Sequence, residues 1–378
     1  MKKHLIIVGG GHAHLTVLKK AGDFVERGHR VTLISSAPYH YYSGMGPGML
    51  SGIYRPEEIR FHIKKMAEDR GVSFVEGNVV RVDPDRRILF LDSNDEIGYD
   101  IVSFNTGSEI PLESVTGRDE KMITVKPIEN LHKARRAVMD LIQTATPRLV
   151  VVGGGAAGLE ISGNIWRLVH DLGGKAQIKL LAGRRLLGRF PEKTRRLAME
   201  SLSARGIEVA EGAHLRRFES GQAVMTDGRK LYYDLLILAL GVKPSSLFRD
   251  SGLPTGDDRG LLVNTHLQSV AYPEIFGGGD CISLESKPLN KVGVYAVRQN
   301  PVLYHNLMAA LEGGNMEPFD PDRPYLLIFS LGDGRGIFWK KNWVWNGRLS
   351  FYLKDYIDRK FMRRFQVSGE RMQQGTNL

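Results

Sequence analysis

The chain is 378 residues long and carries 52 lysines and arginines against 42 aspartates and glutamates, so its net charge is +10. That length suits two or three domains, and the positive surplus favours an anionic partner such as a nucleotide, a nucleic acid or an anionic lipid surface. The single cysteine, Cys281, excludes an intramolecular disulfide and any pair of redox thiols. No apolar run reaches the ~18 residues of a membrane span, and the apolar run near the N-terminus is too short for a signal peptide, so we expect a cytoplasmic protein.

One glycine-rich motif occurs twice in the chain. Residues 5–15 read LIIVGGGHAHL and residues 149–159 read LVVVGGGAAGL. Each is a short buried-strand pattern, a glycine turn and a helix-compatible stretch, which is the opening of a dinucleotide-binding βαβ unit. A second strand pattern follows each opening, at residues 31–35 and 178–181. The repeat therefore predicts two Rossmann-type domains in an α/β fold.

The order of the later strands predicts how these domains are connected. Residues 99–107 (YDIVSFNTG) and 233–241 (YDLLILALG) each indicate the strand that closes one unit, and another core segment follows at 274–280 (EIFGGGD). We therefore expect the second unit, residues 116–244, to be inserted into the first, which comprises residues 1–115 and 245–318. A proline-rich boundary then leads into a small C-terminal domain, residues 319–378.

The first glycine turn offers a phosphate site with two departures from the usual fingerprint. Gly9 and Gly11 allow a tight turn whose backbone N–H groups face a pyrophosphate, and His12 follows directly. The third fingerprint position is His14, and Ser35 and Ser36 stand where an acidic residue usually binds the ribose. The alternative is a glycine turn that opens the sheet and binds no ligand.

The second glycine turn has the complete fingerprint, Gly153, Gly155 and Gly158, with Glu160 two residues later. Arg184 and Arg185 follow the next strand, where an NAD site usually has an acid. Guanidinium groups there suit a 2′-phosphate, so NADPH and NADH both remain open as the donor. The alternative is a solvated basic turn.

Taken in order, these motifs resemble the two-dinucleotide-binding-domain flavoproteins of the pyridine nucleotide-disulfide oxidoreductase superfamily. They are most similar to the branch without a redox disulfide, which includes type II NADH dehydrogenases, and also to the flavoprotein module fused to selenide water dikinase. The resemblance spans about residues 3–312 and implies FAD as cofactor and NAD(P)H as co-substrate. The FAD-binding positions that it implies, beyond the first glycine turn, are Ser43, Val80, Thr106, Gly107, Asp280, Val294 and Tyr295, with Gly241 closing the second unit.

The resemblance also implies the reaction. Hydride passes from NAD(P)H to the flavin, and electrons then go to a quinone or similar small acceptor, with Glu160 and Lys291 as candidate catalytic residues. The lone Cys281 disfavours the thiol chemistries of the superfamily and is expected to be a core residue. Residues 295–299 only partly match the quinone motif of the type II enzymes. The alternative is a reductase of a protein electron carrier such as a ferredoxin.

The C-terminal residues predict a basic amphipathic helix. Lysines and arginines lie mostly off an apolar stripe whose residues recur at spacings of three or four. The residues of this stripe are Leu349, Tyr352, Leu353, Tyr356, Ile357, Phe361 and Phe365. Such a helix is typical of an interfacial anchor, so we expect peripheral contact with the inner face of a membrane through residues 346–365. Packing on its own domain, or on a second copy in a homodimer, is the alternative.

Two further classes of site are not expected. The histidines of the N-terminal region are spread over a strand, a turn and a loop, so we expect no metal site among them. They are His4, His12, His14, His40 and His62. No helix-turn-helix, zinc-finger or RNA-binding pattern is present, so we expect no nucleic-acid partner.

Overall fold

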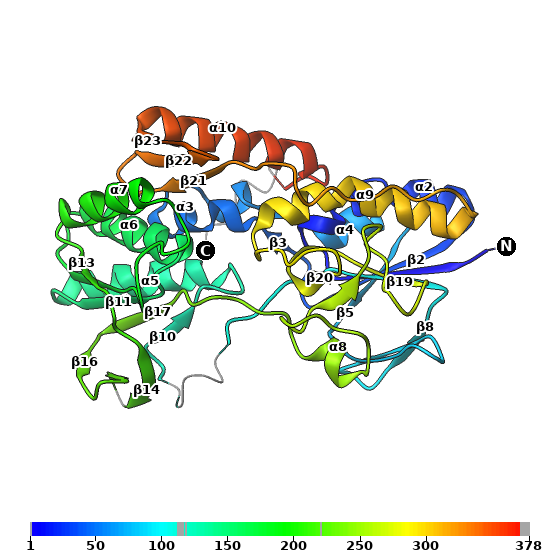
Figure 1. Cartoon of the computed structure of the whole chain (residues 1–378), viewed down its shortest axis with the longest axis horizontal. Coiled ribbons are helices and arrows are strands. Elements are labelled where there is room, and N and C mark those ends of the chain that lie inside the picture. The colour runs from blue at the N-terminus through cyan, green and yellow to red at the C-terminus, as the bar shows by residue number, and fades with distance from the viewer. Residues whose placement is uncertain (1, 112–116, 118, 220, 371–378) are drawn as a thin grey trace.

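The computed structural model describes residues 2–111, 117, 119–219 and 221–370. Two five-stranded parallel sheets lie side by side, and a C-terminal sheet and helix cover one face of the molecule (Figure 1). The predicted fold class, with two Rossmann-type units and a small C-terminal domain, is confirmed.

The first sheet has the strand order β19-β9-β1-β2-β5. Its central strand is a continuous aliphatic run that is almost completely buried, as expected when helices cover both faces of a parallel sheet. The edge strand β19 follows the second unit in the sequence but pairs with β9. The chain therefore returns to the first sheet after completing the second unit. The strands are β1 (His4–Val8), β2 (Arg30–Ser35), β5 (Ser73–Glu76), β9 (Ile101–Phe104) and β19 (Ile275–Gly277).

Helices and short elements surround this sheet. Helix α9 packs against η1 and α1, directly beside the first glycine turn. The elements are η1 (His12–His14), α1 (Leu15–Lys19), α2 (Gly22–Glu26), β3 (His40–Tyr41), η2 (Ser43–Met45), α3 (Gly46–Ser51), η3 (Pro56–Glu58), β4 (Arg60–Phe61), α4 (Ile63–Glu68), α8 (Leu247–Asp250), β18 (Leu261–Val263), η5 (Gly279–Cys281), β20 (Ile282–Leu284) and α9 (Gly293–Glu312).

The second sheet repeats this plan with the order β10-β17-β11-β12-β13. Its strands are β10 (Met122–Thr124), β11 (Arg148–Val152), β12 (Gln177–Leu181), β13 (Glu208–Ala210) and β17 (Leu235–Leu238), and its helices are α5 (Asn130–Thr144), α6 (Ala156–Asp171) and α7 (Glu192–Ser203). Each unit also carries an antiparallel three-stranded sheet: β6 (Val79–Asp83), β7 (Ile88–Leu91) and β8 (Glu96–Gly98) in the first, β14 (Leu215–Glu219), β15 (Gln222–Met225) and β16 (Lys230–Tyr232) in the second.

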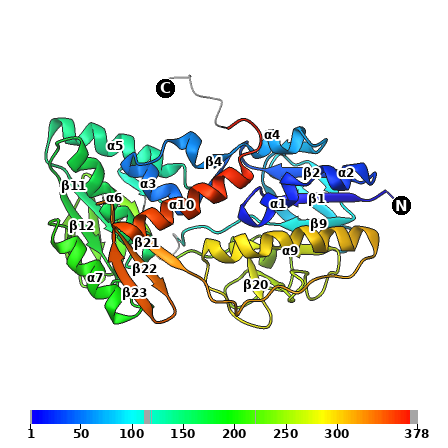
Figure 2. The same cartoon turned by 90° about the horizontal axis from the view of Figure 1, so that it is seen from above.

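The C-terminal domain bridges the two units. It consists of β21 (Leu327–Ser330), β22 (Gly336–Lys340), β23 (Trp343–Gly347) and α10 (Arg348–Phe365). Seen from above, α10 runs from the second unit across to the first (Figure 2). Among the described residues, no helix is long and apolar enough to cross a membrane.

The first turns of α10 turn their apolar stripe outward, as an interfacial anchor requires and unlike the alternative of packing on its own domain. Leu349 is 80%, Tyr352 62% and Tyr356 61% exposed. Polar residues of the opposite face are buried instead, including Ser350 and Asp358. An ion pair with Lys354 and a hydrogen bond from Tyr42 satisfy Asp358, and the apolar Met362 and Phe365 are buried toward the end of the same helix.

His14, the departure at the third fingerprint position, is a structural residue. It is fully buried, with Nδ1 2.6 Å from the carbonyl oxygen of Gly9 and Nε2 2.8 Å from Oγ of Ser103 on β9. The imidazole therefore joins the glycine turn to the neighbouring strand. Burial lowers the pKa of His14 to about 4, so the imidazole is neutral at neutral pH.

This burial makes the protein sensitive to acid. Below pH ~6.5 His14 is protonated in the unfolded chain but not in the folded chain. The free energy of unfolding therefore falls by up to about 1.4 kcal/mol per pH unit, until the pKa of His14 in the folded protein is reached. We expect urea unfolding at pH 7, 6 and 5 to show this fall, and the His14→Gln variant to be less stable at pH 7 but to lose less stability on acidification. Equal pH slopes for the two proteins would contradict this assignment.

Candidate active site

The first glycine turn lies where the carboxyl ends of β1 and β9 meet. Gly9 has a φ of +83°, and a Cβ there would lie 2.4 Å from the carbonyl oxygen of Asn105. A Cβ at Gly11 would lie 2.7 Å from Asn105 Nδ2. Side chains at these positions would push the turn away from β9, so the glycines keep a backbone cradle at the edge of the sheet where α/β proteins bind dinucleotides.

Three buried polar atoms at this edge lack a hydrogen-bond partner among the described residues: His12 Nε2, Asn105 Nδ2 and Gln299 Nε2. The Gln299 side chain is oriented by its other end, since Oε1 accepts a hydrogen bond from Gly279 N at 2.6 Å. Buried polar groups normally have partners, so these atoms indicate a bound polar molecule. The cradle and these atoms fit the FAD that the sequence implies. Sequence analysis missed Asn105, although it lies within the predicted closing segment 99–107 and directly follows the observed strand β9.

Asp280 is held by residues of both units. Its Oδ2 accepts hydrogen bonds from Ser108 Oγ at 2.6 Å and from Lys126 Nζ at 3.0 Å, and Lys126 Nζ also lies 2.6 Å from Ser108 Oγ. Lys126 follows β10 and so belongs to the second sheet, whereas Asp280 follows β19 of the first. The ion pair therefore ties the two units together at the candidate flavin site. Sequence analysis did not find Ser108 or Lys126, because neither lies in a recognisable motif.

The start of α9 faces the loop that contains Ser43. A Cβ at Gly293 would lie 3.7 Å from Ser43 Oγ, and Val294 and Tyr295 form the first turn of the helix. The N-terminal end of this helix thus points its partial positive charge toward the site. Lys291 lies just before α9, but its Nζ donates to the carbonyl oxygen of Ile282 at 2.5 Å and pairs with Asp258 at 2.6 Å.

The remaining predicted flavin positions divide into two groups. Ser35 ends β2 and Ser36 follows it, and Thr106 and Gly107 follow β9, so these four lie at the same edge of the sheet as Gly9. Val80 lies on β6 of the antiparallel sheet and is 53% exposed. Cys281 is buried as expected, and burial raises the pKa of its thiol, which makes it a poor nucleophile.

The second glycine turn has the same construction at the end of β11. Gly153 has a φ of +142°, and its Cβ would lie 2.1 Å from the carbonyl oxygen of Ala239. A Cβ at Gly158 would lie 1.7 Å from the carbonyl oxygen of Gly153, so the first turn of α6 packs directly on the loop. Gly155, in contrast, faces open space, with no described atom within 4 Å of its Cβ position. This opening beside the N-terminus of α6 has the character of a pyrophosphate site.

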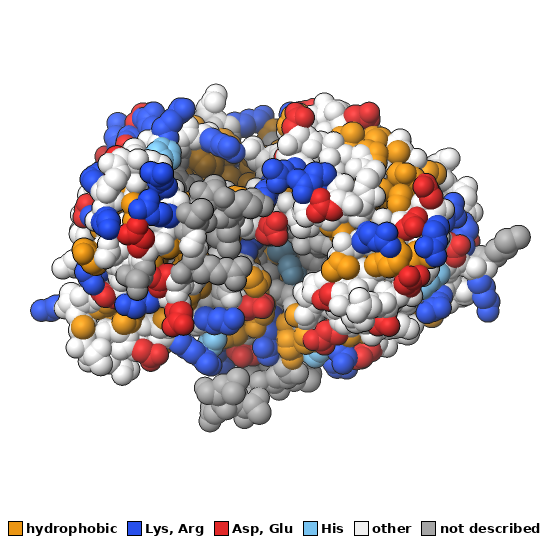
Figure 3. Space-filling view, turned by 90° about the horizontal axis from the view of Figure 1, so that it is seen from below, with side chains coloured by type: hydrophobic (Ala, Val, Ile, Leu, Met, Phe, Trp, Pro, Cys, Tyr) orange, Lys and Arg blue, Asp and Glu red, His pale blue; other side chains and the backbone are white. Residues whose placement is uncertain are grey.

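Around this turn, Gly241 is exposed beyond the end of β17 in the same sheet. Arg184 and Arg185 are exposed after β12, and Arg185 forms an ion pair with Glu192. Seen from below, the surface is hollowed between the two halves of the molecule, and histidine surface is visible in the hollow (Figure 3). Within the described residues, no group of three or more histidine, cysteine or acidic side chains is arranged to hold a metal ion.

Glu160 lies where α6 meets the C-terminal domain. Its Oε1 accepts a hydrogen bond from Ser330 N at 2.7 Å, and burial raises the pKa of its carboxyl to about 7 although the positive charge of Lys354 opposes the shift. Lys354 Nζ donates to Gly44 O and to Asp358 Oδ2, both at 2.6 Å. Burial would lower the pKa of Lys354, but the charges of Asp358 and Glu160 outweigh it and the net shift is upward. Lys354 therefore stays charged inside the protein.

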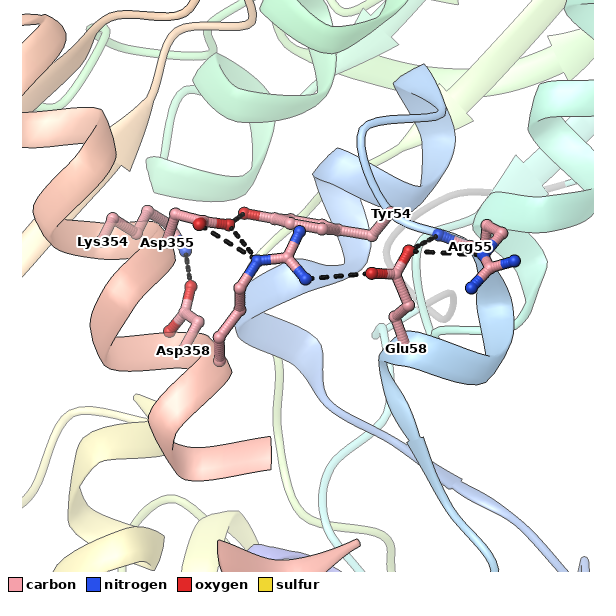
Figure 4. A network of polar contacts seen from close by, with 7 residues as sticks. Tyr54, Arg55, Glu58, Lys354, Asp355 and Asp358 are labelled. Atoms are coloured by element: carbon pink, nitrogen blue, oxygen red, sulfur yellow. Dashed lines mark hydrogen bonds and ion pairs between the residues drawn. The ribbon is translucent and has the colours of Figure 1, made fainter. Parts of the chain in front are cut away.

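A second set of contacts holds α10 against the first unit (Figure 4). Asp355 Oδ1 accepts a hydrogen bond from Tyr54 at 2.8 Å, and both of its oxygens lie 3.0 Å from Nε of Arg359. Arg359 Nη1 reaches Glu58 at 2.9 Å, and Glu58 in turn accepts from Arg55 N at 2.8 Å. The C-terminal helix is thus fastened over the candidate site by polar contacts along its inner face.

Comparison with known proteins agrees with this architecture. The model of the pyridine nucleotide-disulphide oxidoreductase family matches residues 3–309, and the chain belongs to this family. The chain is 25% identical to ferroptosis suppressor protein 1 of Taeniopygia guttata, over 97% of this chain and 96% of that protein. It is 23% identical to a type II NADH:quinone oxidoreductase of Staphylococcus epidermidis, over 94% of each chain.

Solved structures show the same fold. The structure of NDH2 from Plasmodium falciparum in complex with NADH has a TM-score of 0.81 at 15% identity and covers 98% of each chain. The sulfide:quinone oxidoreductase of Aquifex aeolicus has a TM-score of 0.80 at 17% identity, over 97% of this chain and 92% of that one. Family membership confirms the predicted FAD-dependent oxidoreductase that uses a pyridine nucleotide.

The first glycine turn provides a direct test of the FAD site. Gly9 and Gly28 have φ values of +83° and +84°, so alanine strains the backbone equally at both. Only Gly9→Ala also collides with the neighbouring strand, whereas a Cβ at Gly28 meets nothing closer than a lysine side chain at 3.5 Å. A misplaced turn costs about 2 kcal/mol of binding energy or more, roughly a thirtyfold weaker FAD complex.

We therefore expect purified Gly9→Ala to lose its flavin absorbance and Gly28→Ala to keep it. Full flavin content in Gly9→Ala would show that this turn does not contact the cofactor.

Proposed function

We propose that this protein is an FAD-dependent NAD(P)H:quinone oxidoreductase. The type II NADH:quinone oxidoreductase of Staphylococcus epidermidis matches 94% of this chain and therefore extends into the C-terminal domain, which supports an acceptor of the same kind. The observation that carries the proposal is the position of α10, whose inner face is fastened over the candidate flavin site while its outer face exposes apolar side chains. A lipid-soluble acceptor suits a site bordered by such a surface.

The domain roles follow from the two glycine turns. Residues 1–115 and 245–318 form the FAD domain, residues 116–244 the NAD(P) domain, and residues 319–378 the acceptor-side domain. The boundary between residues 115 and 116, and the last residues from 371 onward, lie outside the described residues. FAD when bound accepts hydride from the nucleotide and passes electrons on. Gly9, Gly11, His12, Asp280 and the residues that share their edge would hold it.

The two candidate catalytic residues have different environments. Glu160, with a pKa of about 7, holds or releases a proton near neutral pH, which suits a group that acts at the junction of nucleotide, flavin and acceptor. Lys291 is engaged by Asp258 and the Ile282 carbonyl oxygen, so we assign it a positioning role at the start of α9. We keep the assignment of Arg184 and Arg185 as the residues that select between NADPH and NADH.

A substitution in the second glycine turn tests the donor site without disturbing the fold. Gly155 has a φ of −88° and open space at its Cβ position, so valine fits the protein but occupies the place of the pyrophosphate. We expect Gly155→Val to keep FAD and its thermal stability, yet to lose reduction of the flavin by NADH or NADPH in anaerobic stopped-flow absorbance.

Gly22→Val is the matched control for this variant, because its Cβ position is equally open but lies on α2, away from both turns. It is expected to react like the wild type. Normal reduction in Gly155→Val would place the nucleotide elsewhere.

We also propose that α10 docks on the inner face of the membrane. The exposed side chains Leu349, Tyr352 and Tyr356 project from one face of the helix, with exposed Trp343 nearby on β23. Fully burying one large apolar side chain is worth about 1.5–3 kcal/mol, and basic residues add attraction to anionic lipids. A protein electron carrier such as a ferredoxin is the alternative partner for this surface.

Vesicle flotation distinguishes these partners. Replacing Leu349, Tyr352 and Tyr356 together by serine is expected to weaken binding to anionic vesicles by at least about tenfold, since about 1.4 kcal/mol corresponds to a factor of ten. The control replaces Leu172 and Tyr232, which are 48% and 54% exposed on the second unit, and leaves vesicle binding unchanged. Absence of vesicle binding in the wild type would favour the carrier.

A further inference from the structure

Two histidines from separate elements meet beside the candidate flavin site. His12 follows the first glycine turn, and His40 lies on β3. Nδ1 of His12 and Nε2 of His40 are 3.2 Å apart, and the rings meet edge to face with centroids 4.7 Å apart. This direct imidazole contact is explained neither by the glycine motif nor by the core of the sheet.

The surroundings keep both rings neutral. His12 is 9% exposed and packs against Tyr42 and Phe361, while His40 lies parallel to Phe61. Burial, with a smaller effect from the positive charge of Lys126, lowers the pKa of His12 to about 4. Burial also lowers the pKa of His40 well below its usual value, with further contributions from His12 and Lys126.

The titratable and charged groups that face the pair are few. The positive charge of Lys126 acts on both rings, and Lys126 is itself bonded to Asp280. Tyr42 contacts His12 from the loop side, and its hydroxyl donates to Asp358 of α10 at 3.0 Å. Burial and Asp358 raise the pKa of Tyr42 well above its usual value, so the phenol stays protonated. No carboxylate hydrogen bond to either ring is found among the described residues.

Two neutral imidazoles in contact form a directional chain. Each has one N–H donor and one acceptor nitrogen. When His40 Nε2 donates to His12 Nδ1, the proton of His12 lies on Nε2, which is the buried nitrogen without a partner in the described structure. His12 directly follows Gly11, so this N–H belongs to the same edge as the candidate flavin site, whereas His40 keeps part of its surface exposed.

We propose that His12 and His40 deliver the proton that the acceptor consumes, a role that rests on the proposed quinone reductase function. The overall reaction NADH + quinone + H⁺ → NAD⁺ + quinol transfers two electrons and takes up one proton. His12 gives its Nε2 proton to an oxygen of the acceptor and receives a proton on Nδ1 from Nε2 of His40. His40 then takes a proton from solvent on Nδ1, so both imidazoles are neutral and the charges balance. Each proton is then on the other nitrogen of its ring, and a turn of both rings restores the starting arrangement.

The choice of acceptor separates proton delivery from electron transfer. Ferricyanide takes electrons and needs no proton, because NADH + 2 ferricyanide gives NAD⁺, H⁺ and 2 ferrocyanide. A positioned general acid contributes typically ~10²–10⁴-fold in rate, so we expect His40→Gln and His12→Gln to lower kcat for a short-chain ubiquinone about a hundredfold. The kcat of His40→Gln with ferricyanide stays at the wild-type value. The solvent deuterium isotope effect is expected with ubiquinone and not with ferricyanide.

The resting protein offers a readout that does not depend on turnover. In ¹⁵N NMR spectra of the oxidised holoprotein, His12 is expected to show a protonated Nε2 and an acceptor Nδ1, and His40→Gln alters the Nδ1 signal. His62→Gln is the control, since this histidine belongs to the same region but caps α4 and stacks on Tyr39 instead. Its kinetics with both acceptors and the His12 signals remain those of the wild type.

Several outcomes overturn the proposal. A His40→Gln protein that reduces ubiquinone at the wild-type rate removes the relay, and one that slows equally with ferricyanide shows a structural role only. Failure of the underlying function looks different: the wild-type protein then reduces ferricyanide but not ubiquinone, or its flavin is not reduced by NADH or NADPH at all.

Discussion

The buried ion pair between Lys354 and Asp358 sets the arrangement on which the site depends. The side chains are 13% and 7% exposed, with Nζ and Oδ2 2.6 Å apart, and they are further bonded to Gly44 and Tyr42. Removing one partner from such a pair typically costs about 3–5 kcal/mol, because the other charge is left buried. This pair therefore fixes which face of α10 points inward. The same contacts place Glu160, Tyr42 and the C-terminal domain around one region.

The orientation of α10 has consequences on both of its sides. Inward, the helix contributes Phe361 to the aromatic contacts of His12 and brings a positive charge close to Glu160. Outward, it leaves Leu349, Tyr352 and Tyr356 exposed, while polar contacts and the buried Met362 and Phe365 hold the inner side. A site for electron transfer and a surface suited to a lipid-soluble acceptor are thus two sides of one helix.

Much of the fold was predictable because its signals are local. Each glycine turn follows a strand pattern directly, and the order of the closing strands predicts that β19 returns to the first sheet. The buried polar face of α10 was not predictable, because helical periodicity locates a face but not the side chains that it meets. His14 illustrates the same limit. Its structural role depends on a contact with Ser103, which is distant in the sequence.

The candidate site, like the fold, was predictable where its residues belong to local motifs and not where they depend on tertiary contacts. Asp280 and the glycines belong to recognisable motifs, whereas Asn105, Ser108 and Lys126 act through contacts made only in the folded chain. The contact between His12 and His40 is of this second kind, since nothing in the sequence pairs residues from a turn and a short strand.

The account is tested most directly by the visible spectrum of the purified protein under anaerobic conditions. It predicts a yellow protein whose flavin absorbance is lost on addition of one equivalent of NADH or NADPH and returns on addition of one equivalent of a short-chain ubiquinone. A protein that takes up no FAD, or whose reduced flavin is not reoxidised by the quinone, would contradict it.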